Sequence, residues 1–166
     1  NLVFVLLTPI SNFQFFAAYL LAATIRGAVV GTGVLLATCW IGGLSLAEPL
    51  WALSFTLLGG ALMGSLGMIA GMWAEKFDQL AAFQNFLILP LTMLSGVFYS
   101  VQSLPEFWQT VSRVNPVFYL IDGFRYGFFA VSDASPWLSL GVASAFTAGI
   151  GLLSYVLLVR GYKLRT

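Results

Sequence analysis

The sequence predicts an all-α, polytopic membrane protein with four transmembrane helices and an outer re-entrant helical hairpin. Apolar residues make up 60 % of the 166 residues and charged residues only 8 %, whereas about a quarter of a soluble domain is charged. Four long runs carry no charge, and each is close to the ~20 residues that cross a bilayer core. Such runs satisfy their backbone groups in lipid only as helices, because barrel strands alternate in short segments.

Composition also excludes several function classes. The net charge is +1 without any basic cluster, which argues against nucleic acid as a partner. There is no His, and the one cysteine, Cys39, lies in an apolar run as a small core residue. The chain opens at Asn1 without an initiator Met or a signal peptide, so we expect the C-terminal part of a longer protein.

The four predicted spans follow from the positions of the charges and cover residues 27–47, 49–73, 80–99 and 137–159. Arg26 then stands at the very end of the first run. A long side chain there can snorkel to the interface as an anchor, which we favour over a buried functional charge.

Four spans place both chain ends and the 74–79 loop on one side. That side carries four basic residues and the other side two, so the positive-inside rule predicts a cytoplasmic C-terminus and an external 94–136 segment. The four are Lys76, Arg160, Lys163 and Arg165, and the two are Arg113 and Arg125.

Glycines in the second span form two small-xxx-small pairs, Gly60 with Gly64 and Gly67 with Gly71. Such pairs let helices approach closely in lipid. They predict packing within one subunit, with a dimer contact or the wall of a substrate path as alternatives.

In the third span, Pro90 removes a helical hydrogen bond and Gly96 follows, which predicts either a fixed bend or a hinge.

Near the start of the chain, Thr8 and Pro9 end one helical piece, and Ser11 or Asn12 can cap the next. On the cytoplasmic side this break predicts a short helix along the membrane surface. Residues 1–7 can equally be the end of an earlier span.

The segment between the last two spans contains two short helical patterns. Pro105 and Glu106 are typical of a helix start, apolar residues recur at helical spacing after them, and Asn115 with Pro116 stops this amphipathic helix.

In the second pattern Asp122 and Arg125 stand three residues apart, so they can pair and lower the cost of entering the outer leaflet. The alternative is an interfacial loop with belt aromatics, namely Trp108, Tyr119, Tyr126 and Trp137.

The strings GVFYS (96–100), LPEFW (104–108) and NPVFYLIDGFRYGF (115–128), with a last span and a basic tail, resemble the permease subunit of type-2 ATP-binding-cassette transporters. The likeness is to the bacterial drug and polysaccharide export group. It implies one transmembrane domain over residues 1–166, the C-terminal part of a six-span permease in the bacterial inner membrane. The partners it implies are cytoplasmic ATPase subunits, which bind ATP and Mg, a second permease copy as a homodimer, and membrane lipid.

The resemblance also assigns sites. Residues 1–12 correspond to a cytoplasmic helix that docks on the ATPase, and residues 103–128 to re-entrant helices that close the exit of the path. The implied coupling residues are Leu6, Leu7, Thr8, Pro9, Ile10 and Ser11. The implied gate residues are Pro105, Asn115, Pro116, Asp122, Gly123 and Arg125.

The sequence can be compared with three functions of membrane proteins. An exporter permease is favoured, because no phosphate loop or nucleophile and base pair occurs and ATP hydrolysis must come from a partner. A membrane-embedded enzyme acting on lipid-linked substrates is the alternative, and its candidate residues are Glu106, Arg113, Asp122, Arg125 and Asp133. A channel is disfavoured because no predicted span has a central charge.

Overall fold

The computed structural model describes residues 10–42, 46–97 and 101–161, and within these ranges every regular element is helical. This confirms the all-α class. The elements are α2 (Asn12–Gly42), α3 (Pro49–Trp73), α4 (Phe77–Phe83), the π-helical turn η1 (Gln84–Ile88), α5 (Leu89–Met93), the 3₁₀ turn η2 (Val101–Ser103), α6 (Glu106–Val114), α7 (Pro116–Phe129) and α8 (Pro136–Val159).

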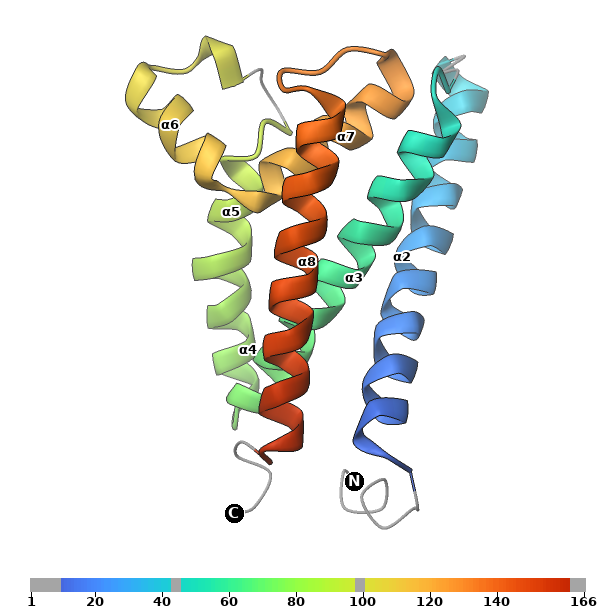
Figure 1. The fold of residues 1–166 in the computed structure, drawn as a ribbon. Helices are drawn as coiled ribbons and strands as arrows, with labels where there is room; N and C mark the ends of the chain where they lie inside the picture. Colours follow the sequence, from blue (N-terminus) through green and yellow to red (C-terminus); the bar gives the residue numbers. More distant parts are fainter. Residues whose placement is uncertain (1–9, 43–45, 98–100, 162–166) are drawn as a thin grey trace.

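Three of these helices are long and apolar enough to cross a membrane: α2 over Asn12–Ile41, α3 over Pro49–Trp73 and α8 over Pro136–Val159. Figure 1 shows the start of α2, the start of α4 and the end of α8 at one end of the molecule, which we call the α4 end. Helices α6 and α7 lie at the other end, the hairpin end. The chain is therefore a multi-pass membrane protein.

The first predicted span was wrong in its position, because α2 begins at Asn12 and not near residue 27. Ser11 starts the helix with a reciprocal cap: its Oγ accepts from the N–H of Gln14 at 3.2 Å, and Gln14 Oε1 accepts from the N–H of Ser11 at 3.0 Å. An arginine does not stop a helix. Arg26 therefore lies in the middle of α2, so the prediction that spans lack a central charge was also wrong.

The third predicted span, residues 80–99, is a helical run from Phe77 to Met93 made of α4, η1 and α5. The π-helical turn precedes Pro90, whose ring cannot fit a regular α-helical turn. The run ends before Gly96, which has a left-handed φ of 79°. The helical irregularity thus lies directly before Pro90, and the helix stops about two turns earlier than predicted.

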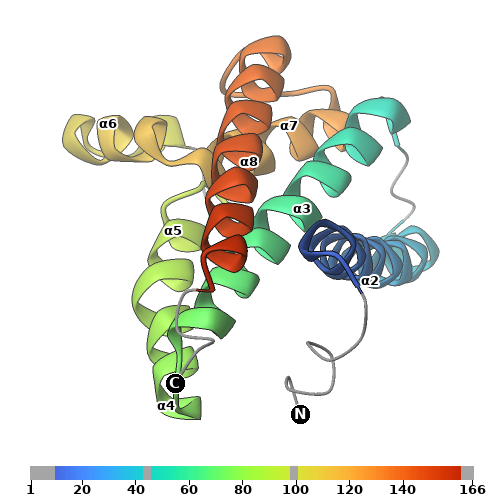
Figure 2. The ribbon, with the colours of Figure 1, turned by 60° about the horizontal axis from the view of Figure 1, so that its bottom comes forward.

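Helix α3 is the central helix and packs against α2, α7 and α8. Its Phe55 and Leu62 are buried with Leu120 of α7 and Ala143 of α8. Figure 2, turned so that the α4 end comes forward, shows α2 beside α3 and α6 projecting on the opposite side. The core is therefore centred on α3.

The first glycine pair brings α2 onto α3. A Cβ added at Gly60 would lie 2.9 Å from the Cα of Thr24, and one at Gly64 would lie 2.9 Å from the Cβ of Ala23. At Gly67 the nearest described atom is the Tyr19 hydroxyl at 3.5 Å, and at Gly71 the described residues place nothing within 4 Å. The close approach of α2 to α3 therefore depends on Gly60 and Gly64.

Candidate functional site

The α6–α7 hairpin turns at Asn115, which is buried and fixes the turn to α5. The Asn115 Nδ2 donates to the carbonyl of Leu91 at 2.6 Å, and its Oδ1 accepts from the N–H of Val117 at 3.0 Å. The Leu91 carbonyl is at the end of α5, where the N–H of Ser95 turns instead to Thr92. Asn115 therefore caps α7 and satisfies the end of α5 at once.

Asp122 forms the centre of a second anchor and is only 1 % exposed. Its Oδ1 accepts from the N–H of Asp133 at 2.7 Å and from Arg125 at 2.9 Å. Its Oδ2 accepts from the N–H of Ala134 at 3.1 Å and from the hydroxyl of Ser139 at 3.4 Å. The predicted pair with Arg125 is present, and it is one part of a larger arrangement that ties α7 to α8.

Arg125 bridges two carboxylates, since its Nη2 also lies 2.7 Å from Asp133 Oδ2. Burial alone would lower the pKa of Arg125, but the hydrogen bond and charge of Asp133, followed by those of Asp122, outweigh it and raise the pKa above its ordinary value. Gln102 in η2 donates to Asp133 at 3.4 Å. The Asp122 cluster (Asp122, Arg125, Asp133 and Ser139) thus joins α7, the 130–135 loop and α8.

Two glycines of α7 seat it against α3. A Cβ at Gly127 would lie 2.6 Å from the backbone nitrogen of Ala52, and a Cβ at Gly123 would clash with the outer edge of the Phe55 ring. The Gly127 carbonyl accepts from the N–H of Glu48 at 2.8 Å. Gly127 and its packing role were missed, although GFRYG repeats the four-residue spacing seen at Gly60 and Gly64.

The predicted site residues fall into separate groups. The hairpin turn and the Asp122 cluster bring Asn115, Pro116, Asp122 and Arg125 to the hairpin end, where α7 rises from the turn (Figure 1). Pro105 is exposed before α6. Of the predicted coupling residues, Ile10 and Ser11 are exposed at the α4 end, and Leu6, Leu7, Thr8 and Pro9 lie outside the described residues.

Chemistry at these positions is limited. Among the described residues no group of three or more His, Cys, Asp or Glu side chains could hold a metal ion. The Asp122 carboxylate accepts hydrogen bonds at both oxygens and is shielded from solvent, so it is placed to hold structure together and not to exchange protons with a substrate.

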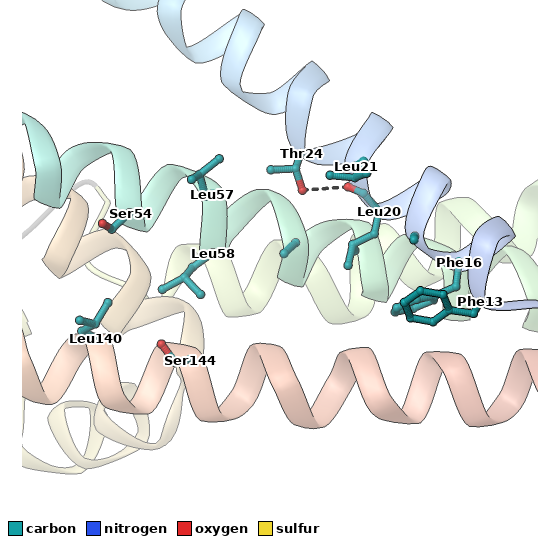
Figure 3. A pocket seen from close by; sticks show the side chains of 12 residues that line it. Phe13, Phe16, Leu20, Leu21, Thr24, Ser54, Leu57, Leu58, Leu140 and Ser144 are labelled. Carbon is teal, nitrogen blue, oxygen red and sulfur yellow. Dashed lines mark hydrogen bonds between the residues drawn. The ribbon is translucent and has the colours of Figure 1, made fainter.

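A hollow of about 780 Å³ lies between α2, α3 and α8 (Figure 3). Phe13 and Phe16 pack edge-on against Tyr155 of α8, with ring centroids 6.3 and 5.5 Å apart, and close it toward the α4 end. The hydroxyls of Thr24 and Ser54 donate to carbonyls of their own helices at 2.8 and 2.7 Å. Its walls are therefore apolar, as for an acyl chain or another helix.

A groove of the same volume, about 780 Å³, lies on another side of α2, between α2, α3, α5 and α7. Arg26, which lies in the middle of α2, lines this groove, so one wall carries a positive charge. A smaller hollow of about 300 Å³ adjoins the Asp122 cluster and is lined by Gln102, Arg113 and Asp133.

Residues 1–129 match the family model of the ABC-2 type transporter. The whole chain is 32 % identical to the inner membrane transport permease YadH of Escherichia coli K12, and it spans 65 % of the length of that relative. It is 28 % identical over 138 residues to nodulation protein J of Rhizobium leguminosarum bv. viciae, covering 83 % of this chain and 53 % of that protein.

Proposed function

The chain belongs to the ABC-2 type transporter family, and on that premise we propose that it is part of the permease subunit of an ATP-driven exporter. A partner ATPase binds ATP and Mg and hydrolyses the nucleotide, because the sequence has no phosphate-binding loop. The permease provides the path across the inner membrane, in agreement with the name of the Escherichia coli relative. A second copy of the permease completes the path as a homodimer.

The observation that most supports an outer gate is that the hairpin is fixed to two different helices. Asn115 joins it to α5, and the Asp122 cluster joins it to α8. A displacement of α5 relative to α8 must therefore either move the hairpin or break one of these anchors. In this proposal ATP binding at the partner biases that displacement, since a ligand shifts an equilibrium only by favouring one of its states.

The run from Phe77 to Met93 is proposed as the fourth span. At 1.5 Å per residue it extends about 25 Å, less than the ~30 Å hydrocarbon core. The α6–α7 hairpin fills the remaining depth, which makes it re-entrant. The basic residues Lys76 and Arg160 of the α4 end support a cytoplasmic position of that end and of the C-terminus under the positive-inside rule.

The proposed ATPase contact is the segment 6–11, as the family resemblance implies. Its described part runs directly into α2 through the Ser11–Gln14 cap, so a force on the segment is passed to a spanning helix. The described residues Ile10 and Ser11 lie at the α4 end, opposite the proposed gate.

The test uses the full-length permease expressed with its ATPase partner. Scrambling residues 6–11 should abolish copurification of the ATPase and ATP-dependent export. The control is Trp40→Ala, which changes a side chain that is 91 % exposed near the end of α2, far along the helix from Ser11, and should leave copurification intact. Stable association after scrambling would refute the docking assignment.

A further inference from the structure

Arg26 is a charge in the middle of a spanning helix. It lies roughly 21 to 24 Å from either end of α2 at 1.5 Å per residue. A contact with α3 supports this central position, because the neighbouring Thr24 packs against Gly60, which is close to the middle of α3. Snorkelling works near helix ends, so Arg26 cannot reach either interface in this way.

No ion pair or hydrogen bond of the Arg26 side chain occurs among the described residues. The two acids of the Asp122 cluster are engaged by Arg125 and by backbone N–H groups. An unpaired charge at this depth is costly, and intramembrane charges commonly mark substrate pathways. The guanidinium thus requires an anionic partner that these residues do not supply.

The groove beside Arg26 has the size and walls of a ligand site. Its volume of about 780 Å³ lies within the range of ~300–1,000 Å³ typical of small-molecule sites. Thr56 and Thr92 also line it, but their hydroxyls donate to carbonyls of their own helices at 2.7 and 2.9 Å. Within the described part of the chain, Arg26 is therefore a cation whose donors have no acceptor, beside largely apolar walls.

We propose that this groove binds an anionic amphiphile within the membrane. Its phosphate, sulfate or carboxylate group pairs with Arg26, for which the planar guanidinium offers two parallel donors, and its hydrocarbon chain lies on the apolar walls. Val117, Leu120 and Phe124 of α7 form part of the wall, so the ligand contacts the hairpin that we propose as the gate. The inference rests on the proposed exporter function, because it names the substrate class of the path.

The experiment measures equilibrium binding of radiolabelled dodecyl phosphate to the purified permease–ATPase complex in a neutral detergent, without nucleotide. Dodecyl maltoside is the uncharged competitor. Arg26→Gln should weaken binding by about tenfold or more, the factor expected when a hydrogen bond to a charged group is lost, and Arg26→Lys should retain most of it. Arg160→Gln removes a cation far from the groove and should change nothing.

A second pair of variants keeps the charge and fills the space. Gly31 lines the groove, Gly33 does not, and a Cβ at either position meets no described atom within 4 Å. Gly31→Leu should therefore weaken dodecyl phosphate binding while Gly33→Leu does not. This comparison remains informative if Arg26→Gln fails to fold.

Equal affinity in Arg26→Gln and the wild type would overturn the inference, as would displacement of the probe by dodecyl maltoside. A lower melting temperature of Arg26→Gln with unchanged binding would also overturn it, because Arg26 would then pair with an acid of a protein segment. ATPase copurification and export are measured in parallel. If the wild-type permease neither copurifies with the ATPase nor supports export, but still binds dodecyl phosphate through Arg26, the exporter function is refuted. The anion site is then retained.

Discussion

Replacing Asp122 by Asn tests whether a buried carboxylate holds the hairpin to α8. Asn has nearly the same shape and can keep one accepting oxygen for Arg125 and the Asp133 N–H. Its amide group then faces the Ala134 N–H, which Asp122 Oδ2 accepts at 3.1 Å in the structure. One half-buried donor, the Ala134 N–H, loses its partner, and the ion pair with Arg125 loses its negative charge.

The expected cost is about 3 kcal/mol. A buried N–H left without an acceptor costs ~1–3 kcal/mol, and removing one partner of a buried ion pair costs ~3–5 kcal/mol. The lower end applies because Asp133 stays 2.7 Å from Arg125 and still neutralises it. At roughly 2–4 °C per kcal/mol, the melting temperature should fall by about 6–12 °C.

The assay combines thermal unfolding of the purified protein in detergent with hydrogen exchange over the 130–135 loop. Exchange there should accelerate, because the Asp133 and Ala134 amides donate to Asp122. Asp78→Asn, at the exposed first turn of α4, is the matched control. A change in stability below about 0.5 kcal/mol, the usual size of a surface substitution effect, with unchanged loop exchange would refute the reasoning.

Two further substitutions address the other hairpin contacts. Gly127→Leu should destabilise the protein by about 1–3 kcal/mol or more, because its side chain meets the Ala52 backbone; Gly141→Leu, where the described residues leave open space, should leave the melting temperature nearly unchanged. Asn115→Ala should cost about 1–3 kcal/mol by leaving the Leu91 carbonyl unpaired and α7 uncapped, seen as faster exchange at the start of α7. Equal melting temperatures of the two leucine variants, or unchanged exchange in Asn115→Ala, would contradict these contacts.

What the sequence could predict is what local chemistry determines. Ser11 caps α2, α6 ends before Asn115, and Asp122 pairs with Arg125, because each feature depends on residues within one helical turn. The start of α2 was missed because the span was predicted from the uncharged run after Arg26, and a charged residue does not end a helix.

The contacts that complete the candidate site join residues far apart in the chain. Asn115 reaches the Leu91 carbonyl, Asp122 reaches Ser139, and Gly127 meets Ala52. None of these contacts produces a periodic pattern in the sequence, because each depends on how two helices cross. The GFRYG string could have indicated the Gly127 contact, but the spacing of small residues does not identify the partner helix.

In the proposed re-entrant arrangement, the ends of the hairpin helices need hydrogen-bond partners within the protein. Short helices within a membrane expose backbone ends that lipid cannot satisfy. Here Tyr119 donates to the Arg113 carbonyl at the end of α6, Asn115 accepts at the start of α7, and Glu48 donates to the end of α7. Moving α3 away would uncover the Gly127 carbonyl, and moving α5 away would uncover the Leu91 carbonyl, so each displacement breaks a hydrogen bond of the hairpin in one step. The hairpin should therefore switch between a fully anchored state and a withdrawn one, as a gate requires, and should not slide gradually.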